Sequence, residues 1–121
     1  MKLNRTIIGK INAVIVYSAW ACFVLTGLLM VYVYFDEKAG LPIFLASLLI
    51  LVLLAIIHAI LAYFVRCPHC NKCLTVQGFA KPHQNSRVSG KKDAWVVVVK
   101  QWFSGSIVCI HCGKEVDTNA L

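Results

Sequence analysis

Cysteine and histidine are the residues of this sequence most able to do chemistry, and they gather in two short segments. One segment reads C-P-H-C from Cys67, and the other reads C-I-H-C from Cys109. Two residues between cysteines let both sulfurs of one tight turn face a single ion, and two such turns supply four thiolates. Four thiolates form the closed tetrahedral coordination of structural zinc. The spacing therefore predicts a zinc site formed by Cys67, Cys70, Cys109 and Cys112.

The residue after each second cysteine supports this interpretation. Asn71 and Gly113 follow the two C-x2-C segments, and both residue types tolerate the left-handed backbone that such a turn often needs. The paired segments resemble the zinc-ribbon family, in which two knuckles at the tips of β-hairpins hold one zinc ion. The resemblance covers residues 67–114 and implies the same four cysteine ligands. Because 38 residues separate the knuckles, it also implies a long insertion.

Iron is the alternative metal. The knuckles are similar to those of rubredoxins, which hold one iron ion for electron transfer, although the basic character of this segment differs from those acidic, soluble proteins. Cys73 is interpreted as a strand residue, with a fifth, competing ligand as the alternative. His69 and His111 lie between their cysteines, where side chains usually point away from a metal, and we expect both to be exposed, with replacement of a cysteine ligand by histidine as the alternative.

The sequence contains no constellation typical of an active site. A nucleophile–base pair, paired carboxylates and a phosphate-binding loop are all missing from it. A closed four-thiolate site also offers no open coordination position for hydrolytic chemistry. The chain is therefore predicted not to be an enzyme.

The elements that must position these cysteines follow from the distribution of charge. No charged residue occurs from Ile11 to Phe35, and none from Leu41 to Val65 apart from the titratable His58. Roughly 20 apolar residues suffice for a helix to cross a bilayer. Transmembrane helices are predicted over residues 11–35 and 43–65, joined by a short turn over 36–42. The first run is too long for the apolar region of a signal peptide and ends without a small-residue cleavage site.

Basic residues determine the predicted orientation. Lys2, Arg5 and Lys10 precede the first span without any acidic residue. Eight basic residues follow the second span: Arg66, Lys72, Lys81, Arg87, Lys91, Lys92, Lys100 and Lys114. Lys and Arg are retained on the cytoplasmic side, so residues 1–10 and 66–121 are both predicted to be cytosolic. The chain is therefore predicted to be an integral protein of a bacterial inner membrane. Its cysteines would then face the reducing cytosol, which disfavours disulfides.

Within the membrane, small and polar residues suggest how the helices pack. Ser18, Cys22 and Thr26 form a mildly polar stripe, and Ala55, Ala59 and Ala62 form a smooth face. We expect these faces to pack on each other, with contact to another subunit as the alternative. His58 is predicted to be structural; a contact with another subunit, or chemistry in the membrane, stays open.

Between the knuckles the sequence predicts short strands around a basic insertion. Leu74-Thr75-Val76 and Ile107-Val108 are expected to be strands, and residues 78–94 a mobile, basic insertion. Four consecutive valines within residues 95–103 favour another strand. An interfacial helix is the alternative, because one helical face would also carry Trp95, Val98, Val99 and Trp102.

The predicted fold class is a membrane protein with an α-helical transmembrane hairpin followed by a small β-rich zinc ribbon. Only Arg66 separates Val65 from Cys67, so the ribbon must lie at the membrane surface. These features favour a non-enzymatic accessory, assembly or regulatory subunit of a larger membrane complex. Its expected partners are a membrane protein and anionic lipid headgroups, and a homo-oligomer stays open. An iron electron carrier is the first alternative. A ribbon that binds nucleic acid or an acidic protein is the second, disfavoured because the basic loop lacks stacking aromatics.

Overall fold

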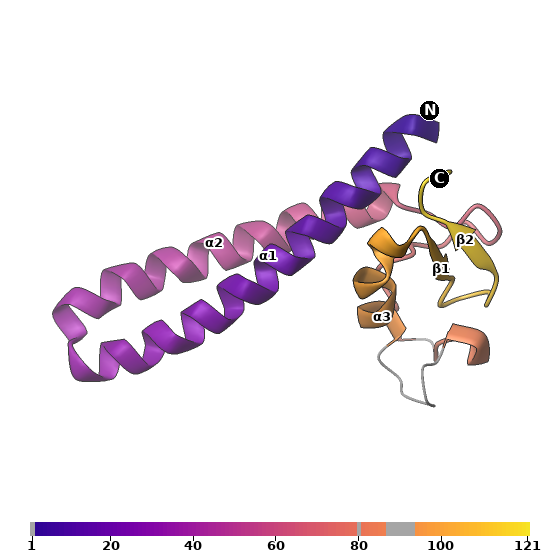
Figure 1. Ribbon diagram of the computed structural model, residues 1–121. Helices are drawn as coiled ribbons and strands as arrows, with labels where there is room; N and C mark the ends of the chain where they lie inside the picture. The colour runs from indigo at the N-terminus through magenta and orange to yellow at the C-terminus, as the bar shows by residue number, and fades with distance from the viewer. Residues whose placement is uncertain (1, 80, 87–93) are drawn as a thin grey trace. The chain divides into compact units, whose positions relative to one another are not determined.

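The computed structural model describes residues 2–79, 81–86 and 94–121, with side chains from Arg5 onward and excluding those of Ala94 and Trp95 (Figure 1). The chain divides into two compact units. The first, called here the ribbon unit, comprises the chain up to Ala13 together with Ile60–Leu121, and the second, the hairpin unit, comprises Val14–Ala59. Along the chain lie the helices α1 (Lys2–Phe35), α2 (Glu37–Phe64) and α3 (Ala94–Lys100), the 3-10 helices Gln84–Ser86 and Trp102–Ser104, and the strands β1 (Ser106–Val108) and β2 (Glu115–Asp117).

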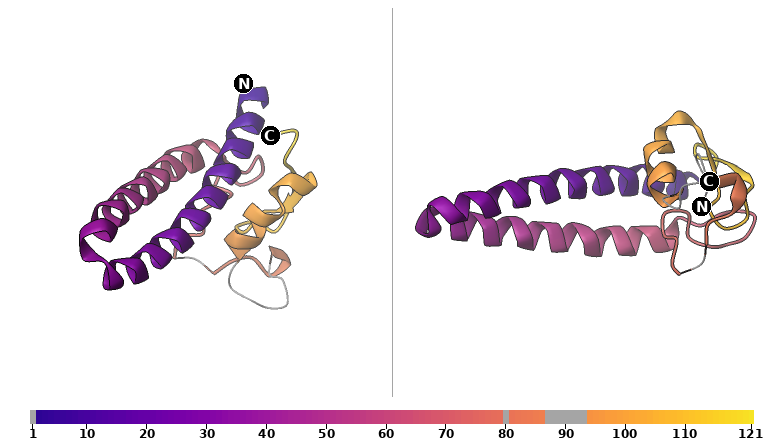
Figure 2. Two further views of the ribbon diagram at one scale, coloured as in Figure 1. Left: turned by 60° about the vertical axis from the view of Figure 1, so that its left-hand side comes forward. Right: turned by 90° about the horizontal axis from the view of Figure 1, so that it is seen from below.

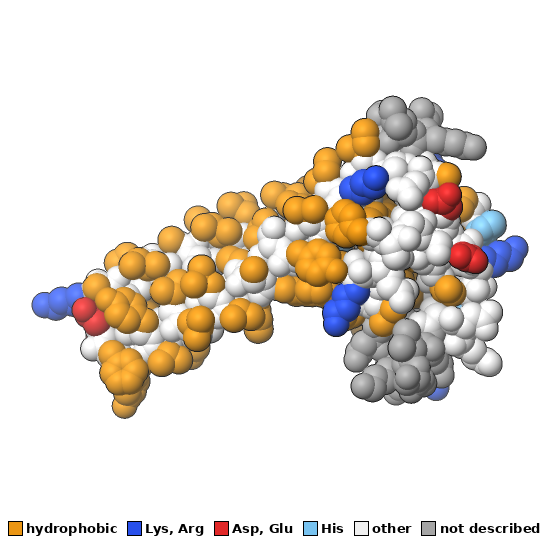
Figure 3. Space-filling model, in the orientation of Figure 1, with side chains coloured by type: hydrophobic (Ala, Val, Ile, Leu, Met, Phe, Trp, Pro, Cys, Tyr) orange, Lys and Arg blue, Asp and Glu red, His pale blue; other side chains and the backbone are white. Residues whose placement is uncertain are grey.

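The prediction of two long apolar helices is confirmed. Arg5–Phe35 and Glu37–Phe64 are each long and apolar enough to cross a membrane. Large apolar side chains along both helices are exposed, including Phe23, Leu28 and Leu49. Hydrophobic side chains accordingly dominate the visible surface of the helical hairpin in Figure 3. A helix that is apolar on all sides requires an apolar environment. Both helices have exposed apolar side chains along most of their length.

The turn between the helices is shorter than the sequence suggested. Only Asp36 lies outside a helix (Figure 2), whereas a turn was predicted over residues 36–42. The Asp36 carboxylate accepts a hydrogen bond from the Ala39 backbone N–H at 3.2 Å, as a helix N-cap does. Gly40 does not end a helix but lies inside α2, where an added Cβ would come within 2.9 Å of the Val33 Cα. Glycine is thus needed for close helix contact rather than for termination.

The contact between the helices within the hairpin unit differs in part from the prediction. The Thr26 hydroxyl donates to Ser47 Oγ at 3.2 Å, and the Cys22 thiol lies 3.6 Å from the Ser47 carbonyl oxygen. Two residues of the predicted polar stripe therefore do face the second helix. Ser18, Ala55 and Ala59 are exposed, however, so the expected contact between stripe and alanine face is wrong at these three residues; Ala62 alone of the alanine face is buried. The tight turn at Asp36 determines the register and places Ser47, not the alanines, opposite Thr26.

Within the ribbon unit, the sheet is smaller than predicted. β1 and β2 pair antiparallel, with Ile107 opposite Val116. The strand predicted at Ile107-Val108 is therefore confirmed, but Leu74-Thr75-Val76 forms no strand, and only an isolated bridge joins Arg66 to Cys73. The described part of the ribbon consists of two three-residue strands and short helices, so the description "β-rich" is wrong.

The strand predicted over residues 95–103 is also wrong. This stretch forms α3, followed by the 3-10 helix Trp102–Ser104. Val98, Val99 and Trp102 are buried, which is the i, i+1, i+4 pattern of one helical face. Burial of that face in the ribbon core outweighs the intrinsic β-propensity of consecutive valines, because such propensity is weak beside tertiary packing.

The first residues of α1 also belong to the ribbon unit. Ala13 is fully buried in its hydrophobic core, together with Val65, Leu74 and Trp102, and Ile8 packs against this core. The Asn12 amide donates to the Thr75 hydroxyl at 3.2 Å, and both residues are buried. The ribbon therefore folds around the beginning of α1, which the sequence had divided between a separate cytosolic segment, residues 1–10, and the first transmembrane span, residues 11–35.

Candidate metal centre

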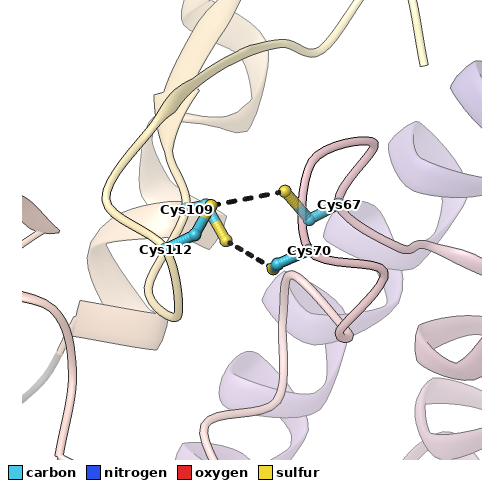
Figure 4. Close-up of side chains that lie close together, drawn as sticks. All are labelled: Cys67, Cys70, Cys109 and Cys112. Carbon is cyan, nitrogen blue, oxygen red and sulfur yellow. Dashed lines mark hydrogen bonds between the residues drawn. The ribbon is translucent and has the colours of Figure 1, made fainter.

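The four predicted ligands meet in the ribbon unit. Their sulfur atoms all lie within 4.8 Å of one another, with Cys67 Sγ 3.8 Å from Cys112 Sγ and Cys70 Sγ 3.7 Å from Cys109 Sγ (Figure 4). A tetrahedron with metal–sulfur bonds of about 2.3 Å has sulfur–sulfur edges of about 3.8 Å. The arrangement of the sulfur atoms therefore fits a single four-coordinate metal ion.

Both knuckles fold by the same local hydrogen bonds. In the first, the Cys67 N–H donates to the Lys72 carbonyl and the Asn71 N–H to the Cys67 carbonyl, each at 2.9 Å. In the second, Cys109 pairs in the same way with Lys114 and Gly113, again at 2.9 Å. Asn71 has a φ of +57° and Gly113 a φ of +70°. The left-handed backbone predicted at these two positions is confirmed.

Burial determines the electrostatics of the site. Cys67 and Cys109 are buried, whereas Cys70 and Cys112 are partly exposed. Burial raises the pKa of the Cys67 thiol and raises that of Cys109 to about 12. At Cys112 burial also acts to raise the pKa, but the hydrogen bond from the Lys114 backbone and the neighbouring thiols outweigh it and lower the pKa. A bound cation would supply the positive charge that two buried thiolates require.

The remaining predicted candidates lie outside the cluster. Cys73 is a partly exposed free cysteine in the bridge with Arg66, in agreement with a strand-like role, and it is not among the four clustered residues. His69 is exposed as predicted. His111 is only partly exposed, and its Nε2 lies 3.0 Å from the Cys73 carbonyl oxygen and 3.2 Å from that of Val76. Carbonyl oxygens only accept hydrogen bonds, so Nε2 carries a proton and joins the second knuckle to the chain after the first.

Part of the insertion predicted as mobile packs on the second knuckle. The His83 N–H donates to the Ile110 carbonyl at 2.8 Å, and the Asn85 amide donates to the Gly113 carbonyl at 3.4 Å. The His83 ring occupies the position where a Cβ on Gly113 would lie. His83 and Asn85 thus contact the second knuckle, while the mobility of the insertion over 78–94 stays a prediction. Arg87, Lys91 and Lys92 lie outside the described residues.

Arg66 connects the end of α2 to the first knuckle. Its Nε donates to the Tyr63 carbonyl at 3.0 Å, its Nη1 donates to the Asn71 carbonyl at 3.3 Å, and its guanidinium lies 4.4 Å from the centre of the Tyr63 ring. One side chain therefore satisfies a free carbonyl at the helix end and one in the metal knuckle. The sequence showed how short this junction is, but it did not reveal these contacts.

The donor set limits what the site can do. Four thiolates leave no open position for a water or substrate, so such a site holds its metal for structure or for electron transfer. Zinc and iron both accept this ligand set, and the sulfur geometry does not distinguish them. Comparison with protein-family models, with curated proteins and with solved structures finds no match for this chain. What is established is a cysteine cluster positioned to bind a metal ion, on a chain with two helices able to cross a membrane.

Proposed function

We propose that this chain is a non-enzymatic accessory, assembly or regulatory subunit of a larger membrane protein complex. In this proposal α1 and α2 cross the membrane, both chain ends are cytoplasmic, and the four cysteines hold a structural zinc ion. The ribbon presents a rigid surface to a partner at the cytoplasmic face, while the exposed apolar side chains of the helices contact lipid and partner helices.

One observation carries this proposal: the cysteine cluster and the ends of both apolar helices belong to the same compact unit. Arg66 joins the first knuckle to the last turn of α2, and Asn12 joins α1 to Thr75, five residues beyond Cys70. A metal placed there stabilises the geometry of the helix ends as well as that of the ribbon. That placement suits a part of a larger assembly better than it suits a catalyst.

Purification of the tagged full chain from its native membrane in a mild detergent tests the proposal. We expect a defined membrane protein to copurify in a constant ratio, together with one zinc ion per chain. A Cys109→Ser variant should lose the zinc and the partner together. Recovery of the chain alone, at every detergent concentration and from intact membranes, would contradict the proposed role.

An iron electron carrier is the second candidate, favoured by the partly exposed Cys70 and Cys112 sulfurs, through which electrons could enter. Metal analysis and the visible spectrum of the purified chain separate the two. A coloured protein with one iron ion per chain, reversibly bleached by reductant, supports the electron carrier. A colourless protein with stoichiometric zinc excludes it.

A further inference from the structure

A turn that carries two exposed apolar side chains, those of Val76 and Phe79, follows the first knuckle. Val76 is 44% exposed and Phe79 is fully exposed. Gly78 lies between them with a φ of +67°, a conformation that reverses the chain there. An exposed phenylalanine ring is unfavourable in water, because it forgoes the stabilisation that burial of its apolar surface would provide. The turn 76–79 therefore exposes the apolar side chains of Val76 and Phe79.

Thr75, the residue before this turn, is hydrogen-bonded to Asn12 near the beginning of α1. Thr75 Oγ1 accepts a hydrogen bond from the Asn12 amide at 3.2 Å, and both side chains are buried. Asn12 comes two residues after Lys10, the last charged residue before the apolar stretch that continues to Phe35. Ala13 is buried in the same core as Leu74. The turn 76–79 thus begins where α1 changes from charged to apolar.

The turn is also held to the metal centre and flanked by positive charge. The imidazole of His111 donates to the Val76 carbonyl at 3.2 Å, so the base of the turn is attached to the second knuckle. Lys72 and Lys81, on either side of the turn in the sequence, are both exposed. An aromatic ring between lysines is the composition that prefers the boundary between acyl chains and anionic headgroups.

From these observations we infer that the turn 76–79 inserts into the interfacial layer of a lipid bilayer. Phe79 enters the upper part of the acyl chains, and Lys72 and Lys81 contact anionic headgroups. The inference rests on the proposed membrane insertion of α1 and α2, and it adds a third contact with lipid, made by the metal-binding ribbon itself. Such a contact fixes the ribbon's tilt at the surface, because the turn and the helix ends touch the membrane at separate points.

Tryptophan fluorescence of the full chain in lipid vesicles tests this inference. A Phe79→Trp variant is reconstituted in phosphatidylcholine–phosphatidylglycerol vesicles with and without bromine on the acyl chains, and the wild-type spectrum is subtracted. We expect the added tryptophan to emit at shorter wavelength and to lose most of its emission in brominated lipid. The matched control is Glu115→Trp, at an exposed position on β2 of the same unit; its emission should be quenched by aqueous iodide instead.

Each outcome has a distinct meaning. If the tryptophan at position 79 is quenched by iodide as strongly as the one at position 115, the inference is wrong. A short-wavelength emission that bromine does not quench, and that disappears as the chain is diluted with lipid, indicates contact with a second copy and also overturns it. The wild-type emission, to which Trp20 in α1 contributes, reports on the proposed membrane insertion separately. If bromine leaves that emission unchanged, the failure lies in the proposed function.

Discussion

The middle histidines of the two knuckles make different contacts although the knuckles are near copies. His69 is exposed, whereas His111 donates from Nε2 toward the carbonyl oxygens of Cys73 and Val76. His111 therefore connects the two halves of the metal site through hydrogen bonds in addition to the shared cysteine cluster. The likeness of the two C-x-H-C segments conceals this asymmetry, because it depends on which chain segment lies opposite each ring.

Replacement of each histidine by alanine should show that only the contacts of His111 contribute to stability. His111→Ala leaves two backbone carbonyls short of a donor, so we expect a loss of about 1–3 kcal/mol in the free energy of unfolding of the ribbon unit. The metal should then pass faster to a competing chelator. His69→Ala, at the corresponding exposed position, should change stability by less than about 0.5 kcal/mol. Thermal unfolding and chelator-competition kinetics measure both effects, and equal effects of the two variants would contradict the assigned contacts.

Cysteine replacement tests which sulfurs hold the metal. Cys109→Ser removes a buried ligand, so we expect loss of the bound metal and unfolding of the ribbon, since structural zinc contributes roughly 10–16 kcal/mol in small domains. Cys73→Ser is the matched control, because Cys73 lies three residues from Cys70 but outside the cluster. It should retain one metal ion per chain by elemental analysis. Loss of metal from Cys73→Ser alone would mean that the ligand set is wrong.

The ligands could be predicted from sequence because their geometry is local. Two residues between cysteines, followed by Asn71 or Gly113, nearly determine each tight turn, and two such turns suggest one ion. The role of His83 could not be predicted in this way. Its ring fills the space left by the missing side chain of Gly113, 30 residues away, and glycine was explained sufficiently by its left-handed backbone. The C-x2-C-G pattern thus explains the left-handed backbone of Gly113, but it gives no sign that a side chain at this position would also collide with His83.

At the scale of elements, α3 shows how periodicity competes with propensity. Four valines in a row favour a strand, and a strand was predicted, yet the stretch is helical because Val98 and Trp102 belong to one core and Val99 is buried beside them. A strand would send Val98 and Val99 to opposite faces. The sequence contained both patterns, and only the position of the core distinguishes between them.

The packing of α1 on the ribbon gives a prediction at this scale. An added Cβ on Gly9 would collide with the indole ring of Trp102, which is 1% exposed. We expect Gly9→Ala to destabilise the ribbon unit by about 1–3 kcal/mol through overpacking. Gly27→Ala in the same helix is the control, because its added Cβ meets nothing within 4 Å. That variant should be neutral or slightly stabilising, since alanine favours helix. Thermal unfolding of both variants in detergent checks this; an unaffected Gly9→Ala variant would mean that α1 does not pack on Trp102.

At the scale of the whole molecule, the division into units does not follow the hydropathy of the sequence. Hydropathy separates two apolar spans from polar ends, but the ribbon unit includes the chain up to Ala13 and the α2 residues from Ile60. The Thr6 hydroxyl, for example, donates to the carbonyl oxygens of Asn119 and Leu121 at 3.4 Å. Contacts between residues more than a hundred positions apart leave no periodic signal, so the sequence could not reveal that both chain ends meet.

Removal of the metal should therefore affect α1 as well as the ribbon. Ala13, Val65 and Cys109 belong to one hydrophobic core, so a ribbon that unfolds on chelation withdraws the packing from the start of α1. A helix end without tertiary packing frays in water. In hydrogen exchange of the reconstituted chain, we expect chelator to abolish the protection of the two knuckles, residues 67–73 and 109–114, and of residues 6–13 together. Residues 14–59 should keep theirs and serve as the internal control. Persistent protection of residues 6–13 beside an exchanging ribbon would show that this part of α1 is stable without the metal, and that the two do not form one cooperative unit.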